Sequence, residues 1–240
     1  MILITGGTGF LGKYICKNLP KRNYIVISRK KIDLPKNFKV IVENDIFTKD
    51  VNWWNKKLSN VKVVIHLAWA IDNKYYFNSP DNSKCFNGTL NLAIACSKKK
   101  IQKFIGIGTE SENYFIKYKK NNKENNLYSF YKYLTYLNLS KIFDKKINNF
   151  IWIRIPYLYG EGEHRFKLKT MIEKYFINKK KIKLKNPNKI KNFIEVSKAA
   201  KIIVKTIFKN YTKNNLIFNL SGERISVIKF TKNILKKMQN

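Results

Sequence analysis

Two side chains that could carry acid–base chemistry, Tyr128 and Lys132, lie four positions apart in the stretch NLYSFYKYLTYL. Residues at that spacing share one face of a helix, so a lysine ammonium there can act on a tyrosine hydroxyl. With 14 Tyr and 49 Lys plus Arg in 240 residues, however, chance also produces such pairs, and a second one occurs at Tyr175 and Lys179. The spacing alone decides nothing, so the prediction depends on where the pair lies in the fold.

A glycine-rich turn near the N-terminus is the second feature that indicates chemistry. In ITGGTGFLGKYI, over residues 4–15, Gly6, Gly9 and Gly12 stand three positions apart between an apolar run and a helix-like segment. The first glycine of such a triplet permits a tight turn, the second lets the backbone approach a pyrophosphate, and the third lets the helix pack closely. Helix N-terminal amides then face the anion. The pattern predicts dinucleotide binding rather than a merely structural turn.

The elements that must position these residues follow from the apolar pattern. Short apolar runs alternate with segments of helical periodicity, which predicts an α/β fold with a Rossmann-type doubly wound parallel sheet. The expected strands are residues 1–4, 24–28, 39–42, 61–68, 103–108 and 150–155, and the expected helices between the later strands are 83–99 and 127–145.

The pattern becomes less regular after Pro156. There it predicts helices over 166–178 and 196–209 and short strands near 182–184 and 216–219. We therefore expect a dinucleotide-binding domain over residues 1–155 and a small α+β substrate-binding part over residues 156–240, interleaved with the first.

Composition excludes several classes of function. The formal net charge of +34 comes from residues spread along the whole chain, mostly Lys accompanied by Asn and Ile, whereas phosphate readers cluster Arg with aromatic residues. Nucleic acid is therefore not an expected partner. The three Cys and two His lack the spacing of a disulfide framework or a metal site. No apolar run approaches the about eighteen residues that span a membrane, and the chain opens on a strand-like run, so we expect a cytoplasmic protein without a membrane partner.

The glycine spacing T-G-x-x-G-x-x-G resembles that of the short-chain dehydrogenase/reductase superfamily. The resemblance is strongest to its extended branch of NAD-dependent nucleotide-sugar epimerases, dehydratases and reductases. Segments similar to motifs of that branch continue along nearly the whole chain: NDI (44–46), HLAWA (66–70), NGTLNLAIAC (87–96), FIGIGTESENY (104–114), RIPYLYGEGE (154–163), IKNFIEV (190–196) and FNLSGERIS (218–226). The chain stops at Asn240, short of the family's usual tail, so we expect a truncated substrate-binding part.

The resemblance assigns roles to three candidate catalytic residues. Thr109 would orient the substrate oxygen, Tyr128 would act as acid or base, and Lys132 would be its electrostatic partner. A free tyrosine has a pKa near 10, and a nearby ammonium and an oxidised nicotinamide would lower that value. The alternative is that Tyr128 belongs to an aromatic helix face together with Tyr131 and Tyr136.

The resemblance also implies the binding residues. For the substrate these are Arg154 and Lys191, the latter standing for a diphosphate-binding arginine. The implied cofactor contacts are Gly6, Gly9, Phe10, Leu11, Gly12, Arg29, Asp45, Ile46, Leu67, Ala68, Lys132 and Pro156.

The end of the second expected strand bears on the cofactor. NAD-binding folds commonly carry an acidic residue there for the ribose hydroxyls, but this chain has Ser28, Arg29 and Lys30, and its first following carboxylate is Asp33. A guanidinium suits a 2′-phosphate, so the sequence favours NADP(H), with NAD as the alternative.

NADP(H) favours a reductase that acts on a 4-keto-6-deoxy nucleotide sugar for surface polysaccharide. The alternative is an NAD-dependent nucleotide-sugar 4-epimerase. A dehydratase stays open because Glu110 follows Thr109, although the Asp-Glu pair of that class is missing, and a catalytically silent dinucleotide-binding module is a further alternative. Family relatives often pair through a helical bundle, which predicts a homodimer formed by 83–99 and 127–145.

Overall fold

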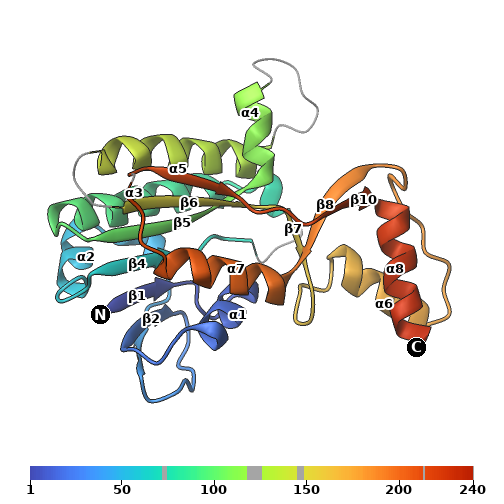
Figure 1. Cartoon of the computed structure of the whole chain (residues 1–240), viewed down its shortest axis with the longest axis horizontal. Coiled ribbons are helices and arrows are strands. Elements are labelled where there is room, and N and C mark those ends of the chain that lie inside the picture. The colour runs from blue at the N-terminus through green and yellow to red at the C-terminus, as the bar shows by residue number, and fades with distance from the viewer. Residues whose placement is uncertain (72–74, 118–125, 145–148, 213, 240) are drawn as a thin grey trace.

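The larger sheet of the protein consists of short, apolar, parallel strands. The structure, a computed structural model, describes residues 1–71, 75–117, 126–144, 149–212 and 214–239. Within these ranges the strand order is β3-β2-β1-β4-β5-β6-β9, and every neighbouring pair is parallel (Figure 1). The strands are β1 (Ile2–Thr5), β2 (Tyr24–Ser28), β3 (Phe38–Val42), β4 (Val63–His66), β5 (Lys103–Thr109), β6 (Asn149–Ile155) and β9 (Leu216–Asn219).

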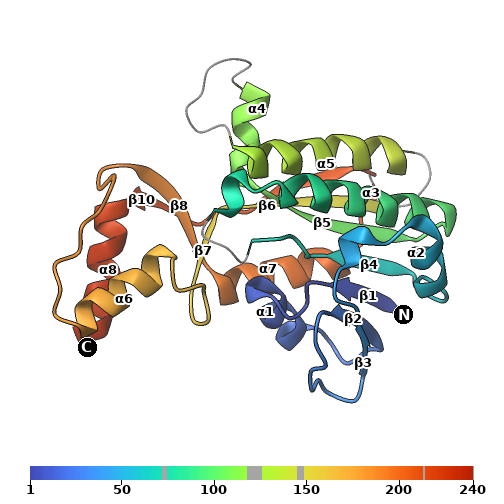
Figure 2. The same ribbon diagram turned by 180° about the vertical axis from the view of Figure 1, so that it is seen from behind.

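Helices cover both faces of this sheet, which confirms the predicted Rossmann-type α/β fold. One face carries α2 (Val51–Lys57), α3 (Asp81–Lys98) and α5 (Leu127–Phe143), and the other carries α1 (Phe10–Asn18) and α7 (Val196–Phe208) (Figures 1 and 2). Helix α5 corresponds to the predicted helix over 127–145. It ends at Phe143, and position 145 lies outside the described residues. Three short 3₁₀ turns and one short helix complete this part of the fold: η1 (Ile46–Thr48), η2 (Tyr76–Asn78), η3 (Glu110–Glu112) and α4 (Asn113–Lys117).

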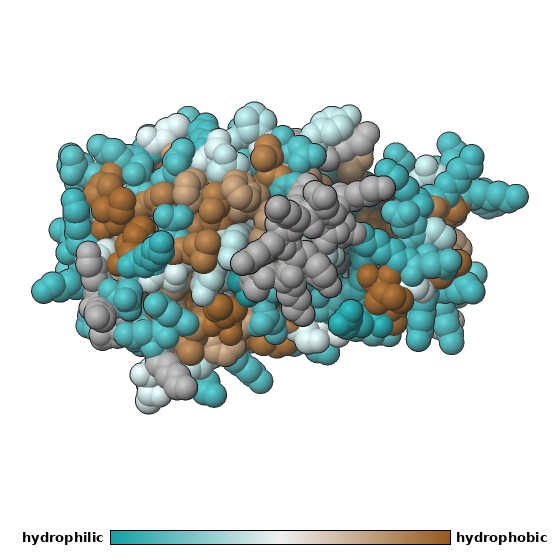
Figure 3. Space-filling model, turned by 90° about the horizontal axis from the view of Figure 1, so that it is seen from above, coloured by the Kyte–Doolittle hydropathy of each residue, from teal (hydrophilic) through white to brown (hydrophobic). Residues whose placement is uncertain are grey.

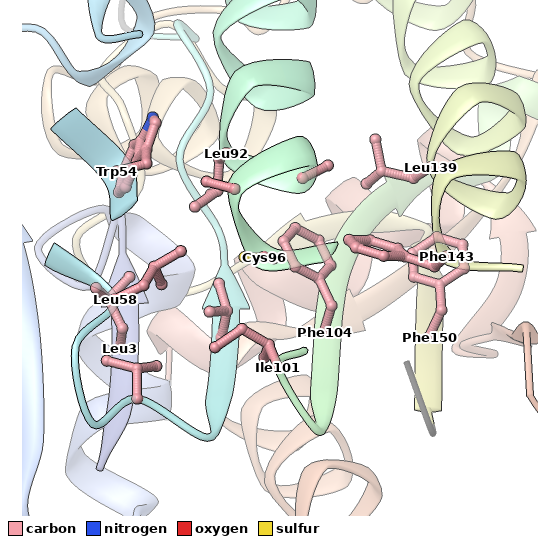
Figure 4. Packing of buried hydrophobic residues seen from close by; sticks show 14 of the residues in the cluster. Leu3, Trp54, Leu58, Leu92, Cys96, Ile101, Phe104, Leu139, Phe143 and Phe150 are labelled. Carbon is pink, nitrogen blue, oxygen red and sulfur yellow. The ribbon is translucent and has the colours of Figure 1, made fainter. Parts of the chain in front are cut away.

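The core is divided by the sheet into two apolar layers. On the α3 and α5 side, aromatic and aliphatic residues from strands and helices meet, among them Phe104, Phe143 and Phe150 (Figure 4). The ring centroids of Phe104 and Phe143 lie 4.9 Å apart. On the other side, α1 and α7 pack against the isoleucine-rich faces of β1 and β5. Burial on both faces explains why these strands are nearly continuous apolar runs.

The C-terminal part forms a second, smaller layer beside the main sheet. Its strands β7 (Tyr157–Tyr159), β8 (Ile190–Glu195) and β10 (Glu223–Ser226) pair in the order β10-β8-β7. Helices α6 (Leu168–Ile177) and α8 (Val227–Gln239) pack against this sheet around Phe193 and Phe230, whose rings stack 4.0 Å apart. Between these strands, α7 and β9 return to the main sheet, where β9 pairs with β6.

One predicted element is wrong. The segment near 182–184 is not a strand, although its alternation of lysine with isoleucine and leucine has the period of one. Ile182 and Leu184 do pack against the α6 and α8 layer, but from an extended loop that pairs with no strand of the described chain. Among the described helices, none has the length and apolar character that a bilayer crossing requires.

Candidate functional site

The glycine turn lies between β1 and α1 and brings main chain from two strands into contact. Gly6 has φ +72°, and a Cβ there would come within 2.6 Å of the Ala68 nitrogen. A Cβ on Gly12 would come within 2.1 Å of the Gly6 carbonyl oxygen. The amide of Gly9 donates to that same oxygen at 3.0 Å. The result is a turn without side chains at the start of α1, and the N-terminus of that helix suits a pyrophosphate.

The other predicted cofactor contacts also lie at or just beyond strand ends. Arg29 is exposed directly after β2, and Asp45 follows β3. Asp45 accepts a hydrogen bond from the amide of Phe47 at 2.9 Å and pairs with Lys84 of α3. Burial opposes ionisation of Asp45, but the hydrogen bonds from Lys84 and the Phe47 amide, together with the Lys84 and Lys49 charges, outweigh it and hold the pKa below its ordinary value.

The remaining cofactor candidates lie in the same region of the fold. Phe10 and Leu11 open α1, and Ile46 opens η1. Leu67 and Ala68 follow β4, and Pro156 follows β6. Because the carboxyl ends of parallel strands meet at one edge of a sheet, the fold brings these predicted contacts to one edge.

His66 is buried beneath this edge, and both of its ring nitrogens are used for contacts within the protein. Its two ring nitrogens contact the hydroxyls of Thr5 at 2.7 Å and Thr89 at 2.9 Å, which links β4 to β1 and α3. Burial, with the Lys132 charge as a smaller cause, lowers the pKa of His66 to about 3. The ring therefore stays neutral at physiological pH.

The three predicted catalytic residues are brought together at the end of β5. Thr109 is the last residue of that strand and is buried. Its side chain is close enough to the hydroxyl of Tyr128, in the first turn of α5, to lower the pKa of that hydroxyl. Lys132 lies one turn further along α5, and its Nζ donates to the Ile107 carbonyl oxygen at 2.8 Å. Tyr175, from the second chance pair, lies in α6 of the smaller layer.

Aromatic rings surround this pair and control its protonation. The ring centroid of Trp69 lies 3.8 Å from Lys132 Nζ and 6.4 Å from that of Tyr128. The Tyr76 and Phe77 rings stand edge-on to Tyr128 at 5.3 and 6.0 Å. Burial lowers the pKa of Lys132 to about 8.

The Tyr128 hydroxyl has a raised pKa in this setting. Burial is the largest cause, the charges of Tyr76 and Glu112 add to it, and the Thr109 hydrogen bond opposes it. The sequence predicts the opposite direction from the proximity of Lys132. The prediction fails for this chain's own residues because desolvation of the phenolate dominates.

A cationic cluster adjoins the aromatic rings, and it includes the predicted Lys191. The Nζ of Lys167 donates to the Tyr76 hydroxyl at 3.2 Å. The ammonium groups of Lys167 and Lys191 lie 5.7 and 5.3 Å from the centroid of the Tyr157 ring. Burial lowers the pKa of both lysines; for Lys167 the Glu163 charge opposes this effect and the Lys191 charge adds to it. Neither pairs with a carboxylate among the described residues, so the cluster suits an anion.

Arg154, the other predicted substrate residue, is buried. Its Nε donates to Glu112 Oε2 at 2.7 Å. Glu112 and Lys167 are the residues of this region that the sequence interpretation missed. A signal existed for Glu112, because Thr109 and Glu112 have the T-x-x-E spacing of a capping box. Lys167 had none, because lysine occurs throughout the chain.

Comparisons with solved structures find the same fold in sugar-nucleotide enzymes. UDP-N-acetylglucosamine 4-epimerase from Methanobrevibacter ruminantium is 19% identical with a TM-score of 0.81, and the alignment covers 100% of this chain and 82% of that chain. UDP-glucuronic acid 4-epimerase from Bacillus cereus, solved with NAD, is 20% identical with a TM-score of 0.81 and coverages of 100% and 83%. The dTDP-glucose 4,6-dehydratase of Streptomyces venezuelae, also solved with NAD, is 15% identical with a TM-score of 0.80 and coverages of 100% and 81%.

At these identities the likeness shows the fold. No curated protein matches the chain at a significant level. The model of the NAD dependent epimerase/dehydratase family, in contrast, matches residues 2–221. That span holds the glycine turn, the Thr109, Tyr128 and Lys132 group and the cationic cluster, and the protein therefore belongs to the NAD-dependent epimerase/dehydratase family.

Proposed function

We propose that the protein is an NAD(P)-dependent oxidoreductase acting at C4 of a nucleoside-diphosphate sugar. Its reaction would be NADPH-dependent reduction of a 4-keto-6-deoxy sugar nucleotide, a precursor of surface polysaccharide. The observation that carries this proposal is the convergence of three residues at the end of β5: Thr109 ends the strand and acts on the Tyr128 hydroxyl, and Lys132 lies one helical turn away, donating to the Ile107 carbonyl oxygen at 2.8 Å. These groups lie at the carboxyl edge of a sheet whose glycine turn suits a dinucleotide.

The chain's own residues supply a binding frame for the cofactor. Amides at the start of α1 would hold the pyrophosphate, and Asp45 would contact the adenine. Arg29 directly after β2, where an NAD-specific acid commonly lies, supports NADP(H). When bound, the nicotinamide would exchange hydride with the sugar.

Proton transfer falls to Tyr128. Because burial raises its pKa, the hydroxyl keeps its proton at neutral pH and can donate it to a carbonyl oxygen. The Thr109 hydroxyl would hydrogen-bond the same oxygen and fix its direction.

The cationic cluster supports a substrate with a diphosphate. Lys191 and Lys167 bring two partly buried positive charges together, and neither forms an ion pair within the described chain. The Glu163 charge offsets part of the cost for Lys167, and a bound anion would offset more. Tyr76 contacts both the Lys167 ammonium and the Tyr128 ring, so a bound anion would lie close to the reacting hydroxyl.

The 4-epimerase is the second candidate function. Two of the three similar structures described above are named 4-epimerases, and one of these two was solved with NAD, which supports NAD as the alternative cofactor. A dehydratase has less support. Glu112 is engaged with Arg154, and Glu110 contacts Asn192 at 3.5 Å.

Replacing Tyr128 by Phe tests the proposed chemistry. The variant should lose at least about a hundredfold in kcat, the scale of a general acid–base contribution, and still bind nicotinamide cofactor. Tyr175→Phe is the matched control, because it alters the other Tyr-x-x-x-Lys pair and should leave turnover unchanged. Equal activity of wild type and Tyr128→Phe would refute the catalytic proposal.

Two assays on the wild type separate the candidate functions. A reductase consumes NADPH with a 4-keto-6-deoxy nucleotide sugar, whereas an epimerase interconverts C4 epimers without net cofactor consumption. Titration with NADPH and NADH adds a second criterion. If NADPH binds no better than NADH, the Arg29 inference fails and the epimerase is favoured.

A further inference from the structure

A buried carboxylate lies directly behind the catalytic threonine. Glu112 is fully buried at the end of η3. Its Oε1 accepts the main-chain N–H of Thr109 at 2.7 Å, and its Oε2 accepts Arg154 Nε at 2.7 Å. The indole N–H of Trp152 lies 3.0 Å from Oε2 and 3.2 Å from Oε1. Four contacts from two strands, β5 and β6, therefore surround one carboxylate.

A glycine in β5, Gly108, leaves the space that the Glu112 carboxylate occupies. A Cβ on Gly108 would come within 2.2 Å of Glu112 Oε1 and within 2.3 Å of Trp152 Nε1. Glycine at this position therefore lets the carboxylate and the indole lie directly against β5. Any larger residue would displace the carboxylate from the Thr109 amide.

Two hydrogen bonds fix Thr109, one at its main-chain amide and one at its side-chain hydroxyl. Glu112 binds its amide, and the Thr109 hydroxyl oxygen accepts the N–H of Ser111 at 3.3 Å. This reciprocal capping box fixes Thr109 at φ −132° and ψ 147°. The direction of the hydroxyl toward Tyr128 thus depends on where Glu112 stands.

The presence of a buried ion pair between Glu112 and Arg154 is by itself weak evidence for a stabilising role. A buried ion pair is often replaceable by well-packed apolar residues, because desolvation cancels much of its attraction. Arg154 is also supported by the Tyr136 ring, whose centroid lies 5.2 Å from the guanidinium carbon. A charged network directly behind Thr109 therefore suggests a role in positioning the adjacent catalytic residues.

The charge of Glu112 also reaches the catalytic pair. It raises the pKa of Tyr128 and opposes the burial that lowers the pKa of Lys132. Removal of that charge would leave the Arg154 guanidinium uncompensated, which acts in the same direction on both groups. Glu112 therefore has a signature in the pH profile that a purely structural residue would lack.

We propose that Glu112, anchored by Arg154 and Trp152, is a positioning residue that holds Thr109 against the Tyr128 hydroxyl. It acts through Thr109 and does not touch the substrate. The same arrangement gives Arg154 a supporting role in place of the substrate contact that the sequence predicts. This inference rests on the proposed function, because it presumes that Thr109 and Tyr128 take part in turnover.

The test compares Glu112→Gln with the wild type in the turnover assay. The variant keeps the side-chain shape but weakens the hold on Thr109 and removes the charge. We expect kcat to fall by about tenfold to a hundredfold with substrate KM changed less than about threefold, as for a misplaced catalytic group. The limb of the kcat–pH profile that reports Lys132, whose pKa lies at about 8, should move to lower pH because the Glu112 charge that raises this pKa is gone.

Matched variants make the outcome specific. Glu173→Gln breaks the pair between Glu173 and Lys169 on the surface of α6 and should change neither kcat nor the pH profile. Arg154→Lys keeps the charge but loses the Nε geometry, and it should show a smaller kcat loss without the full pH shift. Thermal unfolding and cofactor titration show whether Glu112→Gln folds. If it does not, the kcat of Arg154→Lys is used as the test instead.

Two results would overturn the inference. One is a folded Glu112→Gln enzyme with wild-type kcat and pH profile. The other, where Glu112→Gln does not fold, is Arg154→Lys with wild-type kcat. The parallel Tyr128→Phe measurement separates this failure from that of the proposed function. An inactive Tyr128→Phe beside a normal Glu112→Gln refutes the positioning role alone, whereas an active Tyr128→Phe refutes the proposed function itself.

Discussion

Lys132 is held in the fold at a cost to stability. Its ammonium is buried against the Trp69 ring and donates to one carbonyl oxygen, that of Ile107. Burial lowers its pKa from an ordinary 10.5 to about 8. A difference of that size corresponds to an unfavourable term of about 3 kcal/mol at neutral pH. A residue retained against such a term is expected to serve function.

Replacing Lys132 by Met should therefore stabilise the protein and inactivate it. Loss of the Ile107 hydrogen bond and the Trp69 contact offsets part of the gain, so we expect a net increase of about 1–2 kcal/mol in the free energy of unfolding. At this chain length that raises Tm by about 2–8 °C. Thermal unfolding at pH 7 measures the gain, and the turnover assay measures the loss.

The stability gain of Lys132→Met should depend on pH in a defined direction. Below pH 8 Lys132 is protonated in both the folded and the unfolded chain, so the destabilisation is fully present. Between pH 8 and 10.5 the unfolded chain holds a proton that the folded chain has released, so rising pH removes the penalty. The Tm advantage of Lys132→Met should narrow from pH 7 to pH 10. Lys141→Met, on the exposed side of α5, should show no such change, and a constant advantage for Lys132→Met would contradict the assignment.

The sequence predicts the candidate catalytic residues better than their protonation. Tyr128, Lys132 and Thr109 could be found because each sits at a motif position, and the structure brings them together. The raised pKa of Tyr128 could not be predicted, because it depends on rings contributed by residues such as Tyr76, some fifty positions away. Burial of that kind is a tertiary property and leaves no local pattern.

At the scale of the elements, local signals were reliable where backbone geometry demanded a particular residue. The glycine triplet predicts a strand, a tight turn and a helix, and β1 and α1 occupy those places. The pattern near 182–184 failed because alternation specifies only which side chains face the core. Whether a partner strand is available depends on the arrangement of α6, α8 and β8, which the segment itself does not encode.

The glycine turn predicts different outcomes for two neighbouring glycines. A Cβ on Gly12 would lie 2.1 Å from the Gly6 carbonyl oxygen, so Gly12→Ala should push α1 from the turn and cost about 1–3 kcal/mol of stability. A Cβ on Gly9 would meet only that oxygen, at 3.3 Å, and Gly9 has an ordinary φ of −71°. Gly9→Ala should therefore keep Tm nearly unchanged yet weaken dinucleotide binding, because the Cβ occupies the approach to the amides.

Thermal unfolding and NADPH titration of the two variants distinguish these effects. Equal losses of Tm would show that the turn has only a structural role. Unchanged NADPH affinity in Gly9→Ala would show that the pyrophosphate does not approach this turn.

At the scale of the whole molecule, α5 presents apolar residues on more than one side. Its inner residues Leu139 and Phe143 are buried in the core, while Leu127 and Phe130 are 40% and 39% exposed. A helix that is apolar all round is ordinarily covered. Figure 3, which views the side that carries α4 and α5, shows hydrophobic groups among hydrophilic ones over this part of the surface. These features support the predicted homodimer through α3 and α5.

The net charge determines how such a dimer should respond to salt. Each copy carries a formal charge of +34, so two copies repel one another at long range. Because salt screens that repulsion within about 10 Å at 0.1 M, the dimer should tighten as ionic strength rises. Light scattering coupled to size-exclusion chromatography should therefore give twice the mass of 28.4 kDa most clearly at high salt.

A charge placed on the outer side of α5 should prevent this association. Leu137 is partly exposed there, and Leu137→Arg would bury a guanidinium without a partner in the interface, which is strongly unfavourable. The matched control is Ile177→Arg on α6, where the native side chain is 72% exposed and lies in the smaller layer. The first variant should run as a monomer at the salt concentration where wild type and Ile177→Arg run as dimers. A monomeric wild type at high salt, or a dimeric Leu137→Arg protein, would show that α5 is not the interface.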